Sequence, residues 1–186
     1  MRTSTGARAV EPTGEVRTFA PDELIVSKTD LQGRITYVNG TFRRVSGYDE
    51  SELLGRPHNV IRHPDTPRVM FRLLWDELRA GREMFAYINN LAKDGASYWV
   101  LAHVTPSRGA DGGVVGYHSS RRLPDPAAVA EVEALYARLR AAEATQPTPR
   151  AALEASSAML DQELAARGCT YDELVWQVVA GQGRAA

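Results

Sequence analysis

The side chains with the greatest chemical potential gather in one polar segment, His58-Asn59-Val60-Ile61-Arg62-His63-Pro64-Asp65. An arginine, two histidines and an asparagine so close together could present positive charge and hydrogen-bond donors to a bound ligand. The alternative is a solvated loop that caps the helix after it, with Asp65 near the positive end of that helix. Composition alone favours the solvated loop, since most polar loops lie at the surface, and both interpretations stay open at this point.

A metal site built on the four histidines is disfavoured by their spacing. Zinc needs at least three protein ligands that converge at suitable intervals. His58 and His63 flank a short stretch of the same segment, whereas His103 and His118 fall on separate predicted strands. We therefore predict no metal site of this kind. A single histidine is enough to ligate haem iron, which keeps a haem protein among the alternatives.

The sequence lacks the motifs of common enzyme classes. Ser46 precedes Gly47, but the Gly-x-Ser-x-Gly elbow of hydrolases is missing. Cys169 lies far from any histidine in sequence. There is no Gly-x-Gly-x-x-Gly or Walker motif to cradle a phosphate. We therefore predict that this protein is not an enzyme.

Composition narrows the class of protein further. The 186 residues include 22 Lys and Arg against 23 Asp and Glu, a formal net charge of -1, which argues against a general nucleic-acid binder. No apolar run approaches the roughly 20 residues that span a bilayer, and the N-terminus shows no secretory signal. The single cysteine excludes an intramolecular disulfide framework. These observations predict a cytoplasmic protein without a membrane span.

The polar segment is flanked by elements that must position it. Two β-prone runs at 24–29 and 34–39 surround a turn at Gly33. A block of short helices follows, and then a longer helix that begins near Thr66-Pro67 and stops at Gly81. Three more β-prone runs come next, at 85–91, 97–105 and 114–121, with Lys93-Asp94-Gly95 and Asp111-Gly112-Gly113 as turns between them. This order predicts an α+β fold, a five-stranded antiparallel sheet with helices on one face.

The chain turns helical after Pro124. The first C-terminal helix is predicted over 127–143 and carries a short coiled-coil-like apolar stripe. After a Pro-rich linker, a second helix is predicted over 150–167. Thr170 and Glu173 match a capping box that opens a third helix.

Taken together, these residues resemble a PAS domain, and more narrowly the PAS domain of bacterial aerotaxis receptors. The resemblance covers about residues 22–140. The matching stretches include Thr29-Asp30-Leu31, Val45-Ser46-Gly47-Tyr48, Pro57-His58-Asn59, Arg62-His63-Pro64-Asp65, Trp75, Tyr98-Trp99-Val100 and Gly116-Tyr117. The most specific part is the Pro-His-Asn and Arg-His-Pro-Asp pair followed by Trp75.

The resemblance implies a PAS fold whose pocket holds FAD non-covalently and senses redox state or oxygen. Carried over by position, the flavin-site candidates are Asn39, His58, Arg62, His63, Asp65, Trp75 and Asn90. Trp75 could supply one wall of the flat apolar slot that a flavin ring needs. Amides such as Asn39 and Asn90 can both donate to and accept from the polar edge of the ring.

The sequence departs from the family at four positions: Met84, Asn89, Leu91 and Ala92. We expect these changes to reduce positive charge near the mouth of the pocket, where the pyrophosphate of FAD would lie. FMN or an empty pocket therefore remain alternatives to FAD. Two other hypotheses use the same fold: a haem or small-ligand sensor with His103 or His118 facing the pocket, and a cofactor-free PAS dimerisation module.

The expected organisation is a flexible segment at 1–20, a PAS sensor domain at 21–123, a C-terminal signalling helix at 124–144 and a helical tail of unknown role at 145–186. By family resemblance, the expected partner is a protein such as a chemoreceptor or signalling kinase, in a chemotaxis or phosphorelay system. A homodimer is a further possibility.

Overall fold

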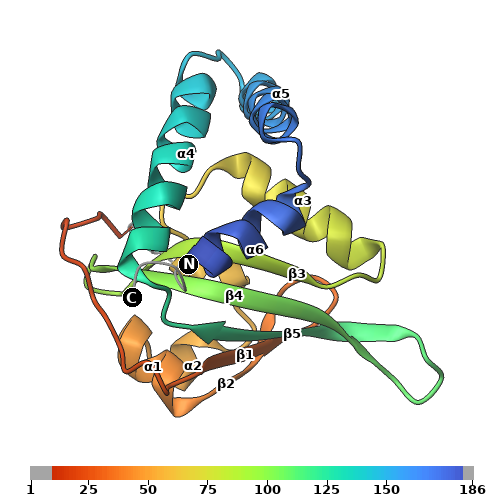
Figure 1. The fold of residues 1–186 in the computed structure, drawn as a ribbon. Coiled ribbons are helices and arrows are strands. Elements are labelled where there is room, and N and C mark those ends of the chain that lie inside the picture. The colour runs from red at the N-terminus through yellow and green to blue at the C-terminus, as the bar shows by residue number, and fades with distance from the viewer. Residues whose placement is uncertain (1–9, 182–186) are drawn as a thin grey trace, which may run out of the picture.

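A five-stranded antiparallel sheet forms the centre of the protein, in a computed structural model that describes residues 10–181 (Figure 1). The strands are β1 (Ile25–Thr29), β2 (Ile35–Val38), β3 (Met84–Leu91), β4 (Ser97–Arg108) and β5 (Val114–Arg122). They lie in the order β2-β1-β5-β4-β3, and every neighbouring pair is antiparallel. The predicted five-stranded antiparallel sheet is therefore confirmed.

The turn between β1 and β2 depends on a glycine. Gly33 has a φ of 74°, in the left-handed region that residues with a Cβ rarely adopt. The backbone N–H of Gly33 donates to the carbonyl of Asp30 at 3.1 Å, and the Asp30 carboxylate accepts from the backbone of Gln32 and Arg34. This local network reverses the chain and leaves Gly33 buried. It lies beside the face of the sheet that the helices between β2 and β3 cover, which we call the first face.

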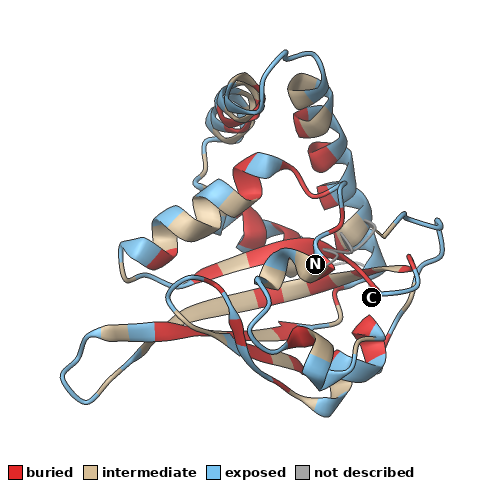
Figure 2. Ribbon diagram, turned by 180° about the vertical axis from the view of Figure 1, so that it is seen from behind, coloured by how far each residue is buried: buried red, intermediate tan, exposed pale blue. Residues whose placement is uncertain are grey.

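The segment between β2 and β3 covers that first face. It contains α1 (Gly40–Ser46), α2 (Glu50–Leu53), the 3-10 helix η1 (His58–Ile61) and α3 (Arg68–Arg79). The core side chains of these helices, no more than 1% exposed, are Phe42, Val45, Leu53, Ile61, Val69 and Met70. Full burial of such side chains contributes about 1.5–3 kcal/mol each. Figure 2 shows the buried residues on the sheet and on the sides of the helices that face it.

The chain ends in three helices, of which the first and third pack on the opposite face of the sheet and the second packs on the first and on α3 (Figure 1). They are α4 (Pro126–Ala144), α5 (Pro149–Arg167) and α6 (Tyr171–Gly181). On α4, the hydroxyl of Tyr136 donates to the carbonyl of Tyr87 on β3 at 2.6 Å, and its ring lies 5.9 Å from that of Trp99. On α6, Trp176 packs against Phe85 of β3, with ring centroids 4.9 Å apart. The sheet is thus covered by the early helices on one face and by α4 and α6 on the other, while α5 lies on α4 and α3.

The α4–α5 pair is antiparallel and is tied together by charged side chains. Arg138 of α4 donates to Glu163 of α5 at 2.8 Å, and Arg167 of α5 donates to Glu131 of α4 at 3.0 Å. The predicted capping box is also present before α6, since Thr170 and Glu173 exchange hydrogen bonds between side chain and backbone.

The chain before β1 differs from the expected flexible segment in its described part. Residues 1–9 lie outside the described residues. The backbone of Ser97, at the start of β4, donates to Glu15 and accepts from Arg17 at 2.8 and 2.7 Å. Phe19 is only 6% exposed and belongs to the core. Residues 13–19 are held because an extended chain can satisfy the backbone groups at the start of β4.

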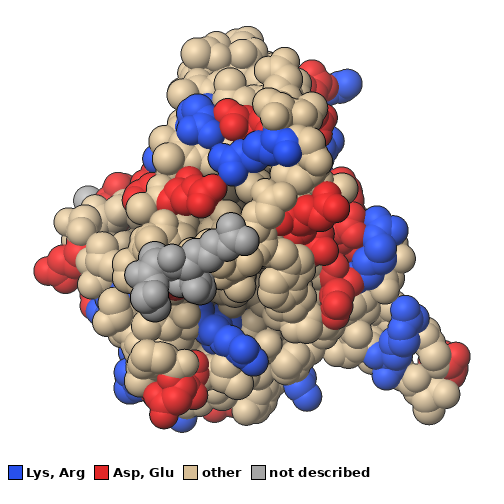
Figure 3. All heavy atoms as spheres, viewed as in Figure 1, with Lys and Arg blue, Asp and Glu red and all other residues tan. Residues whose placement is uncertain are grey.

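Charged side chains of both signs are intermixed on the face shown in Figure 3. This distribution agrees with a net charge of -1 for the whole chain. Within residues 10–181, every helix is too short or too polar to cross a bilayer.

Candidate functional site

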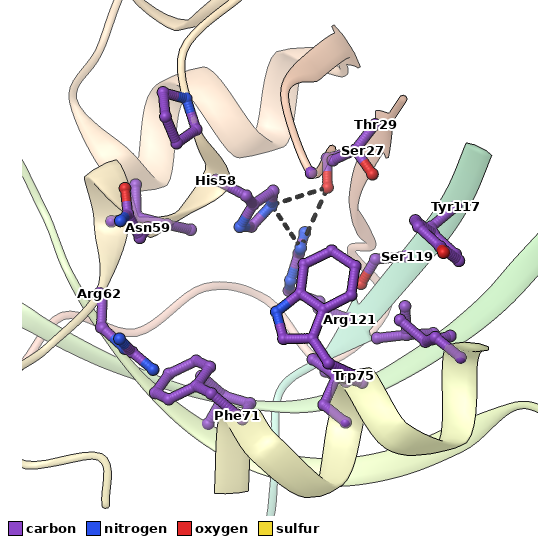
Figure 4. Close-up of a pocket in the computed structure, with 18 of the residues that line it drawn as sticks. Ser27, Thr29, His58, Asn59, Arg62, Phe71, Trp75, Tyr117, Ser119 and Arg121 are labelled. Atoms are coloured by element: carbon purple, nitrogen blue, oxygen red, sulfur yellow. Dashed lines mark hydrogen bonds between the residues drawn. The ribbon is translucent and has the colours of Figure 1, made fainter. Parts of the chain in front are cut away.

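A cavity of about 330 Å³ lies between the first face of the sheet and the helices η1 and α3 (Figure 4). Its volume is at the lower end of the range of ligand-binding pockets, about 300–1,000 Å³. The sheet contributes Ser27, Asn90, Ser119 and Arg121 among other residues, whereas η1, the loop after it and α3 contribute His58, Arg62, Phe71 and Trp75. The cavity is therefore built from strands and helices, which hold its side chains in defined positions.

Three polar side chains form a hydrogen-bonded cluster in the cavity (Figure 4). The Arg121 Nη2 atom lies 2.8 Å from His58 Nε2 and 3.0 Å from Ser27 Oγ, and these last two atoms are 3.0 Å apart. Because a guanidinium can only donate, the Nε2 atom of His58 must accept, which assigns the ring proton to Nδ1. The cluster fixes the guanidinium of Arg121 against a neutral imidazole.

Burial and charge set the protonation of this cluster. Burial, assisted by the positive charge of Arg121, lowers the pKa of His58 to about 3. Burial also lowers the pKa of Arg121 to about 10, so the guanidinium stays protonated at neutral pH. Within the described part of the chain, residues 10–181, no Asp or Glu lines the cavity. The site therefore carries a fixed positive charge without a carboxylate to balance it.

A second arginine lies at the entrance. Arg62 is exposed, and its Cζ atom lies 3.3 Å from the ring centroid of Phe71 on α3, a cation–π contact. Its backbone forms an isolated antiparallel bridge with Asn90 of β3. Partial burial of the guanidinium lowers the pKa of Arg62 to about 10, and it remains charged at neutral pH. The entrance can therefore attract an anionic group.

Trp75 forms a flat wall of the cavity. Its ring packs edge-on against Tyr117 of β5, with centroids 5.5 Å apart and an interplanar angle of 80°. A Cβ atom added to Gly33 would lie 3.0 Å from the Trp75 ring, so the glycine allows the indole to approach the turn closely. The aliphatic side chains of Leu74, Ile88 and others complete the apolar part of the lining.

Several polar atoms of the lining residues are buried without a partner. Among residues 10–181, no hydrogen-bond partner is found for Asn90 Nδ2, Ser119 Oγ or Arg121 Nη1. A buried donor left unsatisfied costs about 1–3 kcal/mol. With two arginines and no carboxylate, the lining is suited to a planar ligand that has hydrogen-bond acceptors or negative charge.

Four of the seven sequence-predicted site residues line the cavity, namely His58, Arg62, Trp75 and Asn90. Asn39 lies outside it and caps α1 instead. Its Oδ1 atom accepts from the backbone of Phe42 at 2.9 Å and of Val26 at 3.0 Å, and its Nδ2 atom donates to the carbonyl of Leu24. Asn39 therefore fastens the start of α1 to β1, a structural use of the same amide chemistry.

His63 and Asp65 also lie outside the cavity. His63 is 5% exposed, its Nδ1 atom accepts from the backbone of Asp65 at 3.1 Å, and burial lowers its pKa. Asp65 is bound by Arg140 of α4, which donates to its backbone carbonyl at 2.7 Å and lies 3.7 Å from its carboxylate. The polar segment is therefore divided between cavity lining and contacts that hold the loop and α4.

The four departures from the family lie elsewhere than expected. Met84, Asn89, Leu91 and Ala92 are all buried, at 6% exposure or less, and none of them lines the cavity. The expectation that these positions lie at its mouth is therefore wrong, because β3 and the residue after it, Ala92, place all four side chains in the interior.

The two histidines of the haem hypothesis lie mostly away from the cavity. His103 stacks on Phe85 at 4.1 Å between ring centroids and contacts Glu83 at 2.9 Å, on the face that carries α6. His118 borders the cavity, but strand alternation directs its side chain to the face opposite Tyr117. His103 therefore does not project into the cavity, where it would have to lie to be an axial ligand of a haem iron.

Sequence reasoning missed the polar residues that the sheet adds to the cavity, Ser27, Ser119 and Arg121. Tyr117, Ser119 and Arg121 alternate along β5 and are all buried, which places them on the face that lines the cavity. The alternation along the strand is visible in the sequence, but serine and arginine are residue types that usually lie at the surface, so the sequence does not indicate that they face inward.

Comparison with known proteins shows which proteins this chain resembles. Residues 35–121 match the family model of the PAS fold. The chain is 42% identical over 123 residues to the aerotaxis receptor of Escherichia coli (strain K12), covering 66% of this chain and 24% of the receptor. It is 30% identical over 97 residues to the nitrogen fixation regulatory protein of Klebsiella pneumoniae, covering 52% and 20%. The chain thus spans about a quarter or less of the length of these relatives.

Solved structures show the same fold. A light-oxygen-voltage domain studied with a flavin analogue superposes with a TM-score of 0.52 at 23% identity, covering 62% of this chain and 87% of that one. The dark structure of the blue-light photoreceptor Aureochrome1 LOV gives a TM-score of 0.51 at 19% identity, covering 63% and 83%. The predicted PAS fold is confirmed by this likeness.

Proposed function

Because residues 35–121 form a PAS domain related to that of the aerotaxis receptor, we propose that this chain is a flavin-binding sensor that reports redox or oxygen status to a protein partner. The observation that carries the proposal is the cavity itself. It combines a flat aromatic wall at Trp75 with the buried cation Arg121 and contains no carboxylate.

The cavity residues fit the chemistry of a flavin. The ring of a flavin has carbonyl and nitrogen acceptors, and the unpaired donors of Asn90, Ser119 and Arg121 match them. Trp75 and the aliphatic residues would hold the flat ring, while Arg62 at the entrance would meet a phosphate. When bound, a flavin supplies reversible electron transfer. FAD is our first candidate, with FMN as the alternative.

A sensor must pass a change in the cavity to its partner, and α4 is the proposed output. Arg121 lies at the end of β5, and α4 begins a few residues later at Pro126. The same helix contacts the loop after η1 through Arg140. We propose a cytoplasmic chemoreceptor or signalling kinase as the partner and a binding role, without enzymatic activity, for this chain.

The test is an absorption spectrum of the purified protein, recorded as isolated and after incubation with FAD or FMN and removal of free ligand. We expect the two-band flavin spectrum at about one flavin per chain. Trp75→Ala should retain less flavin, whereas substitution of the exposed Trp176 on the other face should not matter. A protein that takes up neither flavin contradicts the proposal, and a haem Soret band would favour the haem alternative.

A further inference from the structure

Arg121 is an unusual residue to find inside a protein. It is 5% exposed, it lines the cavity, and its Nη1 atom has no hydrogen-bond partner among residues 10–181. Its other terminal nitrogen is held by Ser27 and by His58, both of which are uncharged. The guanidinium is therefore fixed in place without a negative group to balance it.

The neighbouring groups compensate this charge only in part. The Arg121 Cζ atom lies 5.6 Å from the ring centroid of Phe42, a distance at which a cation–π contact is weak but favourable. Burial raises the pKa of the Tyr98 phenol, so it is neutral beside Arg121, and among residues 10–181 its buried hydroxyl has no hydrogen-bond partner. An unpaired buried cation destabilises a fold, and an apolar residue of similar volume is often tolerated better. Because an unpaired arginine at this position lowers the stability of the fold, its presence indicates that a ligand with a negatively charged group binds beside it.

We propose that Arg121 is the specificity-determining cation of the cavity, which pairs with the negative charge of the bound flavin ring and favours its reduced state. This inference rests on the proposed function. It distinguishes Arg121 from Arg62, because a phosphate is strongly hydrated and would stay near the exposed Arg62, whereas the ring enters the apolar interior.

The negative charge on the flavin ring, with which Arg121 would pair, follows from the stoichiometry of reduction. A flavin that takes up two electrons and one proton gains one net negative charge, while uptake of two protons leaves the charge unchanged. A fixed cation beside the ring stabilises the first product relative to the oxidised flavin. In the experiment below, an electrode supplies the electrons through mediator dyes and the buffer supplies the proton.

The test compares the midpoint potential of bound FMN in the wild type, Arg121→Gln, Arg121→Lys and the control Arg122→Gln. Arg122 is the next residue on β5, is exposed and does not line the cavity. We expect Arg121→Gln to weaken binding of reduced flavin relative to oxidised flavin at least tenfold. That ratio lowers the midpoint potential by about 30 mV for a two-electron couple. Arg121→Lys, which keeps the charge, should restore most of the difference, and Arg122→Gln should behave like the wild type.

Two further measurements make the outcome decisive. The same comparison with riboflavin, which has no phosphate, should give the same shift in midpoint potential. A shift seen with FMN alone would mean that Arg121 binds the phosphate and not the ring, and would overturn the inference. In the ligand-free protein, Arg121→Met should be as stable as the wild type or more so, while FMN should stabilise it less. A protein that binds flavin with an unchanged potential in Arg121→Gln and Arg121→Lys contradicts only the role of Arg121. A wild type that binds no flavin contradicts the proposed function itself.

Discussion

Arg140 of α4 donates a hydrogen bond of 2.7 Å to the backbone carbonyl of Asp65, in the loop that follows the cavity residue Arg62. The next turn of α4 repeats the contact, since the Glu143 carboxylate accepts from the backbone of Arg68 at 2.7 Å. Arg68 begins α3, the helix that carries Phe71 and Trp75 into the cavity. The end of α4 is thus bound to the loop after η1 and to the start of α3, two elements that contribute residues to the cavity, and a ligand that moves them would move α4.

Arg140→Ala tests this connection. We expect the unfolding free energy to fall by about 1–2 kcal/mol, mainly through the lost bond to the Asp65 carbonyl, because the exposed ion pair with the Asp65 carboxylate contributes little. Hydrogen exchange should become faster at the end of α4 and in the 62–68 loop. The matched control is Arg138→Ala, which removes a contact between α4 and α5. Equal exchange in the loop of both variants would contradict the connection.

Gly33→Ala tests the close approach of the turn to Trp75. The added methyl would meet the indole at 3.0 Å and would also force a residue with a Cβ to a φ of 74°. Gly55→Ala is the control, because Gly55 has a φ of 75° with open space around its Cβ position. Both variants should lose about 1–2 kcal/mol of stability from the backbone. Only Gly33→Ala should also displace Trp75 and weaken FMN binding, measured by titration; equal binding in both would show that the turn does not position the indole.

The fold was largely predictable because its signals are local. The turns at Gly33, Lys93-Asp94-Gly95 and Asp111-Gly112-Gly113 separate strands with clear β propensity, and the structure has the strands where these turns require them. The path of residues 13–19 was not predictable, since their pairing with Ser97 joins segments about 80 positions apart. The packing of α5 and α6 depends on tertiary contacts of the same kind.

The site was predictable only in part, because one residue type serves several purposes. Asn39 and Asp65 have side chains suited to a ligand, but the amide of Asn39 caps α1, and the carboxylate of Asp65 lies outside the cavity, 3.7 Å from Arg140 of α4. Arg121 shows the reverse case, since an arginine near the end of a strand reads as a surface residue until the sheet turns it inward. Burial of a charge is a property of the assembled fold, and no local pattern reports it.

Tyr136→Phe tests the attachment of α4 to the sheet. The buried hydroxyl donates to the carbonyl of Tyr87, and its removal should lower the unfolding free energy by about 1–2 kcal/mol. Tyr37→Phe is the control, because Tyr37 is 44% exposed, so loss of its hydroxyl should change stability by less than about 0.5 kcal/mol. Urea unfolding measures both, and equal midpoints for the two variants would contradict a stabilising role of the Tyr136 hydroxyl.

His58 gives the protein a dependence on pH that can be assigned to one residue. Its pKa falls from an ordinary value near 6.5 to about 3 in the folded protein, because burial and the charge of Arg121 disfavour the imidazolium. Between these two values, the unfolded chain binds a proton at His58 that the folded chain does not bind. Stability should therefore be fully present above pH 6.5 and decline as the pH falls towards 3, by up to about 1.4 kcal/mol per pH unit.

His58→Gln removes this titration while keeping an acceptor for Arg121. His63 and His118 also have lowered pKa values through burial, so they contribute the same slope to both proteins and cancel in the difference. Urea unfolding of the ligand-free wild type and variant, measured from pH 4 to 8, should give curves that run parallel above pH 6.5 and converge or cross below it. Curves that stay parallel down to pH 4 would mean that the His58 imidazole accepts a proton in the folded protein. The neutral cluster around Arg121 would then be wrong.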